Sequence, residues 1–142
     1  MNQIIEQIKK LEDLIKIYPK NFINYFDLGI IYVKLNKYDL ALTNFQKTVD
    51  LNKNFFQGYN NLANIYKELQ NTEKSIKFFK KAIKLNPNYI NALYNLAIVY
   101  SEIGKYEKSS IYFKKVLKIN PKHIAALNNF GLLLKSVNKY DA

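Results

Sequence analysis

Apolar side chains recur along this chain at intervals of three and four residues, which is the spacing of one face of an α-helix. Residues 56–89 contain two such faces in succession, formed by Tyr59, Leu62, Ala63 and Tyr66 and then by Ile76, Phe79, Ala82 and Ile83. Pro87 follows the second face, and proline cannot continue a helix. The pattern therefore predicts two helices joined by a short turn.

The same pattern returns with a constant period, which is the interval from Pro87 to Pro121. The same interval counted backwards from Pro87 reaches Lys53 and then Pro19. Large residues recur in three rows, which are Leu28, Leu62, Leu96 and Phe130, then Tyr32, Tyr66, Tyr100 and Leu134, and then Phe45, Phe79 and Phe113. We expect full units at 22–55, 56–89 and 90–123, with an N-terminal helix in residues 1–21 and a partial unit in 124–142.

Small and turn-forming residues share this period. Two rows of small residues are Gly29, Ala63, Ala97 and Gly131, and Ala41, Ser75 and Ser109. Small side chains on one helix let an aromatic ring of the partner helix approach closely. The residues that we expect to take the left-handed conformation after a first helix are Asn36, Asn71, Gly104 and Asn138.

These residues resemble the tetratricopeptide repeat, a helix–turn–helix unit with the same period. The resemblance covers essentially the whole chain, with departures at Lys53, Thr48 and Leu134. It implies an all-α fold, a right-handed superhelical solenoid of antiparallel helix pairs with seven or eight helices in a single domain. It also implies that the first helices of successive units line a concave groove, which holds an extended peptide or a partner helix.

The two ends are half a unit out of phase with the repeat. Residues 2–17 place Ile4, Ile8, Leu11 and Ile15 on one face, as in a second helix without its first. The C-terminal NKYDA repeats the NKYDLA of residues 36–41. We expect either a piece of a longer array or a short protein whose ends associate head to tail.

One register of the expected groove forms a row of amides. The residues just before the leucine row are Asp27, Asn61, Asn95 and Asn129. An asparagine amide both donates and accepts, so it can pair with the C=O and N–H of a peptide group. The row is similar to the asparagine row in the repeat domain of O-linked N-acetylglucosamine transferases. The alternative is that these asparagines bond to neighbouring helices of the chain itself.

The remaining groove candidates are apolar in unit one and polar in unit two. An apolar cluster with Phe26 and Ile30, together with Tyr94 of unit three, is a candidate anchor for a hydrophobic side chain of the partner. Asn60 and Asn64 are polar candidates in unit two. The alternative for Phe26 and Ile30 is that the N-terminal helix covers them.

The net charge of +11 comes from 22 lysines without a single arginine, against 11 acidic residues. Lysines crowd the second helices, where we expect a solvated outer face; the alternative is a basic stripe for nucleic acid or acidic lipid. The missing arginine disfavours specific reading of nucleic acid. Lysine, asparagine, isoleucine and tyrosine fill about half of the chain, a bias typical of an AT-rich genome.

Catalysis and metal binding find no support in the composition. The chain has no cysteine and one histidine, His123, which we expect to be a solvated loop residue, and its four glycines are isolated. We therefore expect no catalytic residue, no metal and no cofactor. No segment resembles a signal peptide or a membrane span, so we expect a soluble, cytoplasmic protein.

The function we expect is a non-enzymatic scaffold that binds a protein or peptide in its groove. We do not expect it to bind the acidic C-terminal tails of chaperones, because the matching positions lack a cation in either register; they are Asn60, Asn64, Asn95 and Ala125, or Phe26, Ile30, Asn61, Asn91 and Asn95. The alternatives are a basic helical-repeat nucleic-acid binder, or the non-catalytic repeat region of a larger enzyme such as a glycosyltransferase.

Overall fold

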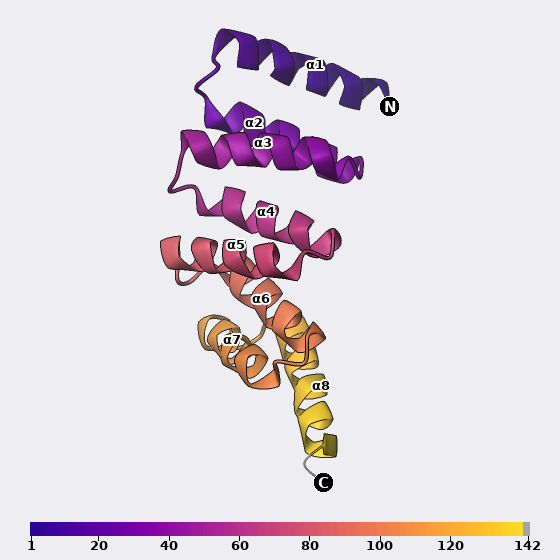
Figure 1. The fold of residues 1–142 in the computed structure, drawn as a ribbon, viewed down its shortest axis with the longest axis vertical. Coiled ribbons are helices and arrows are strands. Elements are labelled where there is room, and N and C mark those ends of the chain that lie inside the picture. Colours follow the sequence, from indigo (N-terminus) through magenta and orange to yellow (C-terminus); the bar gives the residue numbers. More distant parts are fainter. Residues whose placement is uncertain (141–142) are drawn as a thin grey trace.

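The computed structural model describes residues 1–140, and these residues form eight helices and no strand. The helices are α1 (Asn2–Ile17), α2 (Phe22–Lys34), α3 (Tyr38–Leu51), α4 (Phe56–Glu68), α5 (Thr72–Leu85), α6 (Ile90–Glu102), α7 (Tyr106–Ile119) and α8 (Ile124–Tyr140). They follow one another along the long axis of the molecule, with the two termini at opposite ends (Figure 1). The all-α solenoid predicted from the sequence is confirmed.

The helices divide into two sets. The first helices are α2, α4, α6 and α8, and the second helices are α1, α3, α5 and α7. Each of α2, α4 and α6 packs most extensively on the second helix that follows it, and each second helix also contacts the next first helix. First helices contact one another, α4 with α6 and α6 with α8, whereas no two second helices of the described chain are in comparable contact. The first helices therefore form the inner face of the array, and the second helices form its convex outer face.

The predicted rows form the core. Phe45, Phe79 and Phe113 are completely buried, one in each helix pair. A Cβ atom added to Gly29 would lie 2.6 Å from Cε1 of Phe45, so this glycine is required for the close approach of α2 and α3. Ser75 and Ser109 have a second role, because each hydroxyl donates to a carbonyl of its partner helix, at Ala63 (2.9 Å) and Ala97 (2.7 Å) respectively.

Of the four residues predicted to take the left-handed conformation after a first helix, two do not take it. The positive φ angles occur at Asn36, Gln70 and Gly104, each one period from the next. Asn71 instead caps α5, where its Oδ1 accepts a hydrogen bond from the Lys74 N–H at 3.1 Å. Asparagine suits both positions, and the side-chain cap decided between them.

The expected turn at Asn138 is also wrong, because α8 continues through this residue to Tyr140. Asn138 is not among the residues with a positive φ angle in the described chain, so the helix is not interrupted there. The last two residues of the repeated NKYDA motif, Asp141 and Ala142, lie outside the described residues.

Both ends of the array are less buried than its middle. Helix α1 packs on α2 through its predicted apolar face, but none of its residues is fully buried. On α8, the side chains of Leu127 and Leu134 are 48% and 46% exposed, and a Cβ added to Gly131 would touch nothing within 4 Å. Within residues 1–140, no helix has the length and apolar content needed to cross a membrane.

Candidate peptide-binding groove

Two of the three predicted amides are available on the inner face. Asn61 on α4 and Asn95 on α6 are half-buried, and their side chains form no hydrogen bond with any described residue. Asn129 on α8 differs, because its Nδ2 donates to the Tyr94 hydroxyl at 2.7 Å. The predicted row therefore contains two unengaged amides, Asn61 and Asn95. The third, Asn129, joins α8 to α6, which agrees with the alternative that these asparagines bond to neighbouring helices.

Tyr94 joins neighbouring units and does not stand free as an anchor. Its ring centroid lies 6.1 Å from that of Phe113 and 5.2 Å from that of His123, and its hydroxyl accepts the hydrogen bond from Asn129. These contacts connect α6 with α7, with the loop before α8, and with α8 itself. The ring is only half-buried, so one part of it still contributes to the inner face.

His123 is not the solvated loop residue that we expected. It is half-buried, and its Nδ1 accepts a hydrogen bond from the backbone N–H of Ala126 at 3.1 Å. It therefore caps the N-terminus of α8 in the way that serine or asparagine usually does. The sequence did not predict this role, because histidine is an uncommon capping residue.

Phe26 belongs to an aromatic cluster inside the array. Its ring centroid lies 5.6 Å from Phe45 of the core and 5.0 Å from Phe55 in the loop before α4. Asn60 occupies the equivalent position one repeat later and is only 4% exposed, with an Oδ1 that has no hydrogen-bond partner among the described residues. Phe26 is half-buried against the Phe45 and Phe55 rings, and Asn60 is buried, so its amide is not open to a ligand in the described structure.

A common register explains these positions. Phe26, Asn60 and Tyr94 are spaced by one period, and each lies one residue before a member of the amide row. One step along an α-helix rotates the side chain by about 100°, so these three side chains point in a different direction from the amides. The sequence contains a matching row of rings, Phe55, Tyr89 and His123, in the loops that precede first helices. Phe55 contacts Phe26, and His123 contacts Tyr94. The row of rings in the loops was therefore a sequence signal that the Phe26, Asn60 and Tyr94 positions face the loops.

A pocket of about 420 Å³ lies between α2 and α4 on the inner face. Its apolar wall is formed by Ile30, Val33 and Ile65. The amides of Asn61 and Asn64 line it as well, and the other lining residues are Lys34, Asn36, Tyr38 and Glu68. The structure thus brings together three predicted site residues, Ile30, Asn61 and Asn64, in one pocket with an apolar wall and amide groups.

Ile30 also borders a second cleft of about 410 Å³, between α1 and α2. Asp27 lies in this cleft, and burial raises the pKa of its carboxyl group. The N-terminal helix therefore reaches one side of Ile30, as the alternative interpretation proposed, while the other side remains open to the pocket at α4. Asp27 shares the register of the amide row but faces α1.

One ion pair joins neighbouring first helices on the inner face. Lys67 on α4 and Glu102 on α6 approach to 4.0 Å and so pair across neighbouring first helices. The groove beside this pair presents amides and apolar surface. Within the described residues, no group of three histidine, aspartate or glutamate side chains is placed to hold a metal ion.

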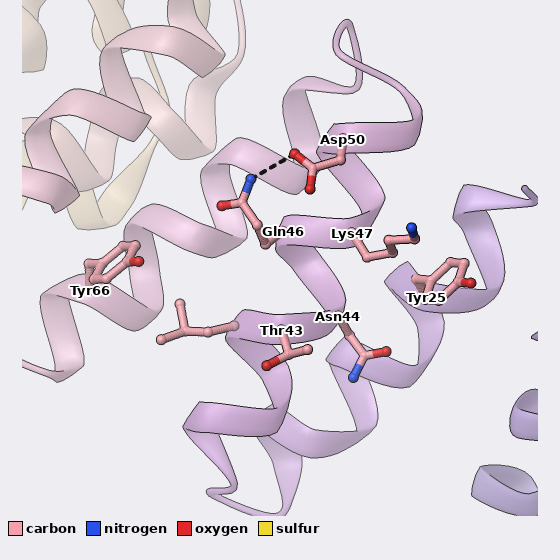
Figure 2. Close-up of a pocket in the computed structure, with 8 residues that line it drawn as sticks. Tyr25, Thr43, Asn44, Gln46, Lys47, Asp50 and Tyr66 are labelled. Atoms are coloured by element: carbon pink, nitrogen blue, oxygen red, sulfur yellow. Dashed lines mark hydrogen bonds between the residues drawn. The ribbon is translucent and has the colours of Figure 1, made fainter.

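Another hollow, of about 570 Å³, lies on the other side of the molecule over α3. Figure 2 shows its polar side chains spread along this helix, with Tyr25 and Tyr66 at its two margins. Gln46 donates to Asp50 at 2.9 Å, and the Tyr25 hydroxyl donates to the carbonyl of Pro19 at 3.0 Å. Several of these polar groups are therefore already bonded within the chain, and the side chains do not converge on a common point (Figure 2).

Stacked helix pairs with a polar inner groove define a helical-repeat interaction scaffold. Family models for the tetratricopeptide repeat match residues 55–122 and residues 29–70. The chain belongs to the tetratricopeptide-repeat family. No curated protein sequence matches it significantly.

Several solved structures share the fold. A crystal structure of MamA is 25% identical, with a TM-score of 0.86 over 94% of this chain and 78% of MamA. A tetratricopeptide repeat protein from Parabacteroides merdae is 24% identical, with a TM-score of 0.88 over 99% of this chain and 56% of that one. The first repeat domain of Spaghetti (RPAP3), bound to the HSP90 peptide SRMEEVD, is 21% identical, with a TM-score of 0.79 over 82% of this chain and 95% of that one.

Proposed function

We propose that this protein binds an extended segment of another protein along its inner face and catalyses no reaction. The tetratricopeptide-repeat fold supports a role as a protein–protein interaction scaffold. The observation that carries the finer proposal is the pair of unengaged amides, Asn61 and Asn95, on neighbouring first helices. Half-buried amides without a partner in the described chain are suited to hydrogen bonding with a ligand.

The spacing of the amides suits a polypeptide main chain. Neighbouring helices pack roughly 8–10 Å apart, and an extended peptide advances about 3.3 Å per residue. Asn61 and Asn95 would therefore meet the backbone of the peptide at about every third residue. Because each amide offers donors and an acceptor, it holds a peptide group irrespective of the side chains.

The pocket beside Asn61 supplies the selectivity that the amides lack. Its apolar wall of Ile30, Val33 and Ile65 is suited to one aliphatic or aromatic side chain of the bound segment. Lys34 and Glu68, which carry opposite charges, also line this pocket, so it has no strong net charge. We expect bound segments to share one large apolar residue next to a stretch of variable sequence.

We further propose that acidic C-terminal tails are not the ligand. The Spaghetti domain shares this fold and is bound to the HSP90 peptide SRMEEVD, which ends in an acidic residue. In this chain, the positions expected to hold such a tail carry no cation. Lys67, which pairs across the first helices in the described structure, already faces Glu102.

The test begins with peptides selected from a random-sequence display library on the immobilised protein. Their affinities are then measured by calorimetry for the wild type and for a double variant, Asn61→Ala with Asn95→Ala. Loss of hydrogen bonds worth about 0.5–1.5 kcal/mol each should weaken binding on the order of tenfold or more. The matched control is Asn54→Ala with Asn88→Ala, because these asparagines are exposed in loops between repeats.

The control variant should bind like the wild type, and SRMEEVD should not bind. All variants should keep their helical circular dichroism, since the four side chains make no internal hydrogen bond in the described structure. Failure to select any peptide, or equal affinity of the wild type and the Asn61/Asn95 variant, would contradict the proposal.

A further inference from the structure

The outer side of α5 and α7 is densely basic. We call this surface the lysine face and define it by Lys74, Lys77, Lys80, Lys81 and Lys84 on α5 and Lys108, Lys114, Lys115 and Lys118 on α7. All nine side chains are exposed. They lie on second helices, which form the convex side of the array, opposite to the groove.

The charge of the lysine face is not neutralised by the described chain. The two ion pairs of the described residues involve Lys16 and Lys67, so no ammonium group of the lysine face lies within 4.0 Å of a described carboxylate. Residues 72–142 contain 13 lysines and 4 acidic residues, whereas residues 1–71 contain 9 and 7. The positive charge is therefore concentrated in the half of the chain that includes α5 and α7.

Aromatic rings hold several of these lysines in a repeated arrangement. Lys74 lies 5.1 Å from the ring centroid of Tyr66, and Lys108 lies 5.6 Å from that of Tyr100, one period later. Lys81 and Lys115, also one period apart, lie over rings at 5.7 Å and 5.0 Å. Such cation–π contacts orient an ammonium group but leave its charge in place.

The lysines of the two helices occupy equivalent positions of the repeat. Four pairs are each separated by one period, namely Lys74 and Lys108, Lys80 and Lys114, Lys81 and Lys115, and Lys84 and Lys118. All eight side chains are exposed on second helices, so they lie on the same side of the array. Like charges gathered on one surface repel one another, and a bound polyanion removes this repulsion.

We propose that the lysine face binds the phosphate backbone of single-stranded nucleic acid without reading its sequence. A strand carries one negative charge per nucleotide and is flexible enough to follow a convex surface. Binding neutralises phosphates with lysines and releases counterions. This site is separate from the peptide groove.

The ring contacts argue against recognition of bases. Phe78 stacks with Tyr66, at 5.6 Å between ring centroids, and with Tyr59, at 6.2 Å. Tyr100 and Tyr112 stack at 5.7 Å. Rings that already stack on each other or lie beneath lysines are less suited to stacking with a base, and the chain has no arginine to pair with guanine.

A membrane surface and a duplex fit this face less well. Helix α5 has no exposed large apolar side chain to insert between lipids, and α7 has only Ile111 and Ile119. A convex face also touches a flat bilayer only along a narrow strip. A duplex is stiff over far more than the length of this molecule, with a persistence length of about 50 nm. A flexible strand makes the longest contact.

The test is a fluorescence anisotropy titration of a labelled oligo(dT) of about 20 nucleotides and of a mixed-sequence strand of equal length, over a salt range of roughly 50–200 mM. We expect similar affinity for both strands, and a log–log salt slope of about −0.7 for each phosphate contacted. The test variant replaces Lys80, Lys84, Lys114 and Lys118 with glutamine, which leaves the four paired cation–π contacts of Lys74, Lys81, Lys108 and Lys115 intact.

The control variant replaces four other exposed lysines, Lys9, Lys20, Lys37 and Lys53, with glutamine and so has the same net charge. The test variant should bind at least about tenfold more weakly than the control variant at an intermediate salt concentration, with a shallower salt slope. The Asn61/Asn95 variant should bind the strand like the wild type, which separates this site from the groove.

Three results would overturn the proposal. They are absence of binding at the lowest salt concentration, equal weakening by the test and control variants, and tighter binding to phosphatidylserine vesicles or to duplex DNA than to the single strand. Circular dichroism of each variant confirms that it is folded before the titration.

Discussion

The same residue type at the same position of the repeat meets two different environments in this protein. Gly29 on α2 and Gly131 on α8 are three periods apart in the sequence. The space beside Gly29 is filled by the buried ring of Phe45, whereas the space beside Gly131 is open. The free-energy cost of adding a side chain at this position of the repeat therefore depends on the residue that packs against it, and not on the position itself.

This difference predicts opposite effects of one substitution. Gly29→Ala should lower the free energy of unfolding by about 1–3 kcal/mol, because the new Cβ displaces Phe45 in a close-packed core. Gly131→Ala should raise it by up to about 1 kcal/mol, because alanine favours the helix over glycine and meets no obstacle. Urea unfolding followed by circular dichroism measures both, and a destabilised Gly131→Ala variant would show that α8 packs more tightly than described.

Single residues also decide which polar groups remain available for a ligand. Asn60 and Asn61 are adjacent, yet Asn60 is almost completely buried while Asn61 lines the pocket between α2 and α4. Asn61 and Asn129 share a register, yet of the two only Asn129 bonds to a tyrosine hydroxyl. The chemical identity of an amide is thus not enough to assign it to binding.

At the scale of the helices, the turn after α2, α4 and α6 uses one left-handed residue. Asn36, Gln70 and Gly104 occupy this position. In each turn the backbone N–H of the following residue donates to a carbonyl of the predicted tyrosine row, from Lys37 to Tyr32, from Asn71 to Tyr66 and from Lys105 to Tyr100, at 2.8–2.9 Å. This hydrogen bond closes the turn that reverses the direction of the chain before the second helix. In α8, which no described second helix follows, the turn is not formed.

Reciprocal substitutions test the cost of this conformation. Gln70→Gly should stabilise the protein by up to about 1 kcal/mol, because a residue with a Cβ atom is disfavoured in the left-handed region. Gly104→Gln should destabilise it by about 1–2 kcal/mol for the same reason. Thermal unfolding of the two single variants measures the effects; an unchanged midpoint for Gly104→Gln would contradict the assignment of this turn.

Part of the asparagine excess has a structural reason at this scale. Asn52, Asn86 and Asn120 follow the second helices and are one period apart. The Oδ1 of each accepts a hydrogen bond from the backbone N–H two residues later, at 3.1–3.2 Å. This local bond directs the chain into the next first helix, so the composition at these positions is explained by the loop.

At the scale of the whole molecule, burial decreases from the centre of the array to its ends. Helices α4 and α6 each contain six buried residues, while α1 contains none. In a repeat array each unit is stabilised mainly by its neighbours. Units with one neighbour should therefore open more often than units with two.

Native-state hydrogen exchange measures this gradient. We expect the slowest backbone amides in α4 and α6, and faster exchange in α1 and in the last turns of α8, because local opening costs less where few apolar groups are buried. Helix-resolved mass spectrometry or NMR supplies the measurement. Equal protection of α1 and α4 would contradict the expectation.

The two faces of the array also divide the chemistry of the molecule. The inner face presents amides and an apolar pocket, and the outer face of α5 and α7 presents lysines without a carboxylate partner in the described chain. The two surfaces are separate because first helices form the inner face, whereas the lysine face lies entirely on second helices.

The repeat period was enough to predict the helices, their pairing and the core, because each unit has the same local preferences and the same apolar rows. Phe45, Phe79 and Phe113 could be assigned to the core from their spacing alone. The side chains of the inner face that are unengaged could be identified only from the packing of the helices, and so could the left-handed residue Gln70, whereas Asn36 and Gly104 were predicted correctly. The contacts of Asn129 with Tyr94 and of Phe26 with Phe55 follow from the distances between helices, which spacing along the chain does not contain. The cap formed by His123 is local, but histidine is not a residue from which a cap is usually predicted.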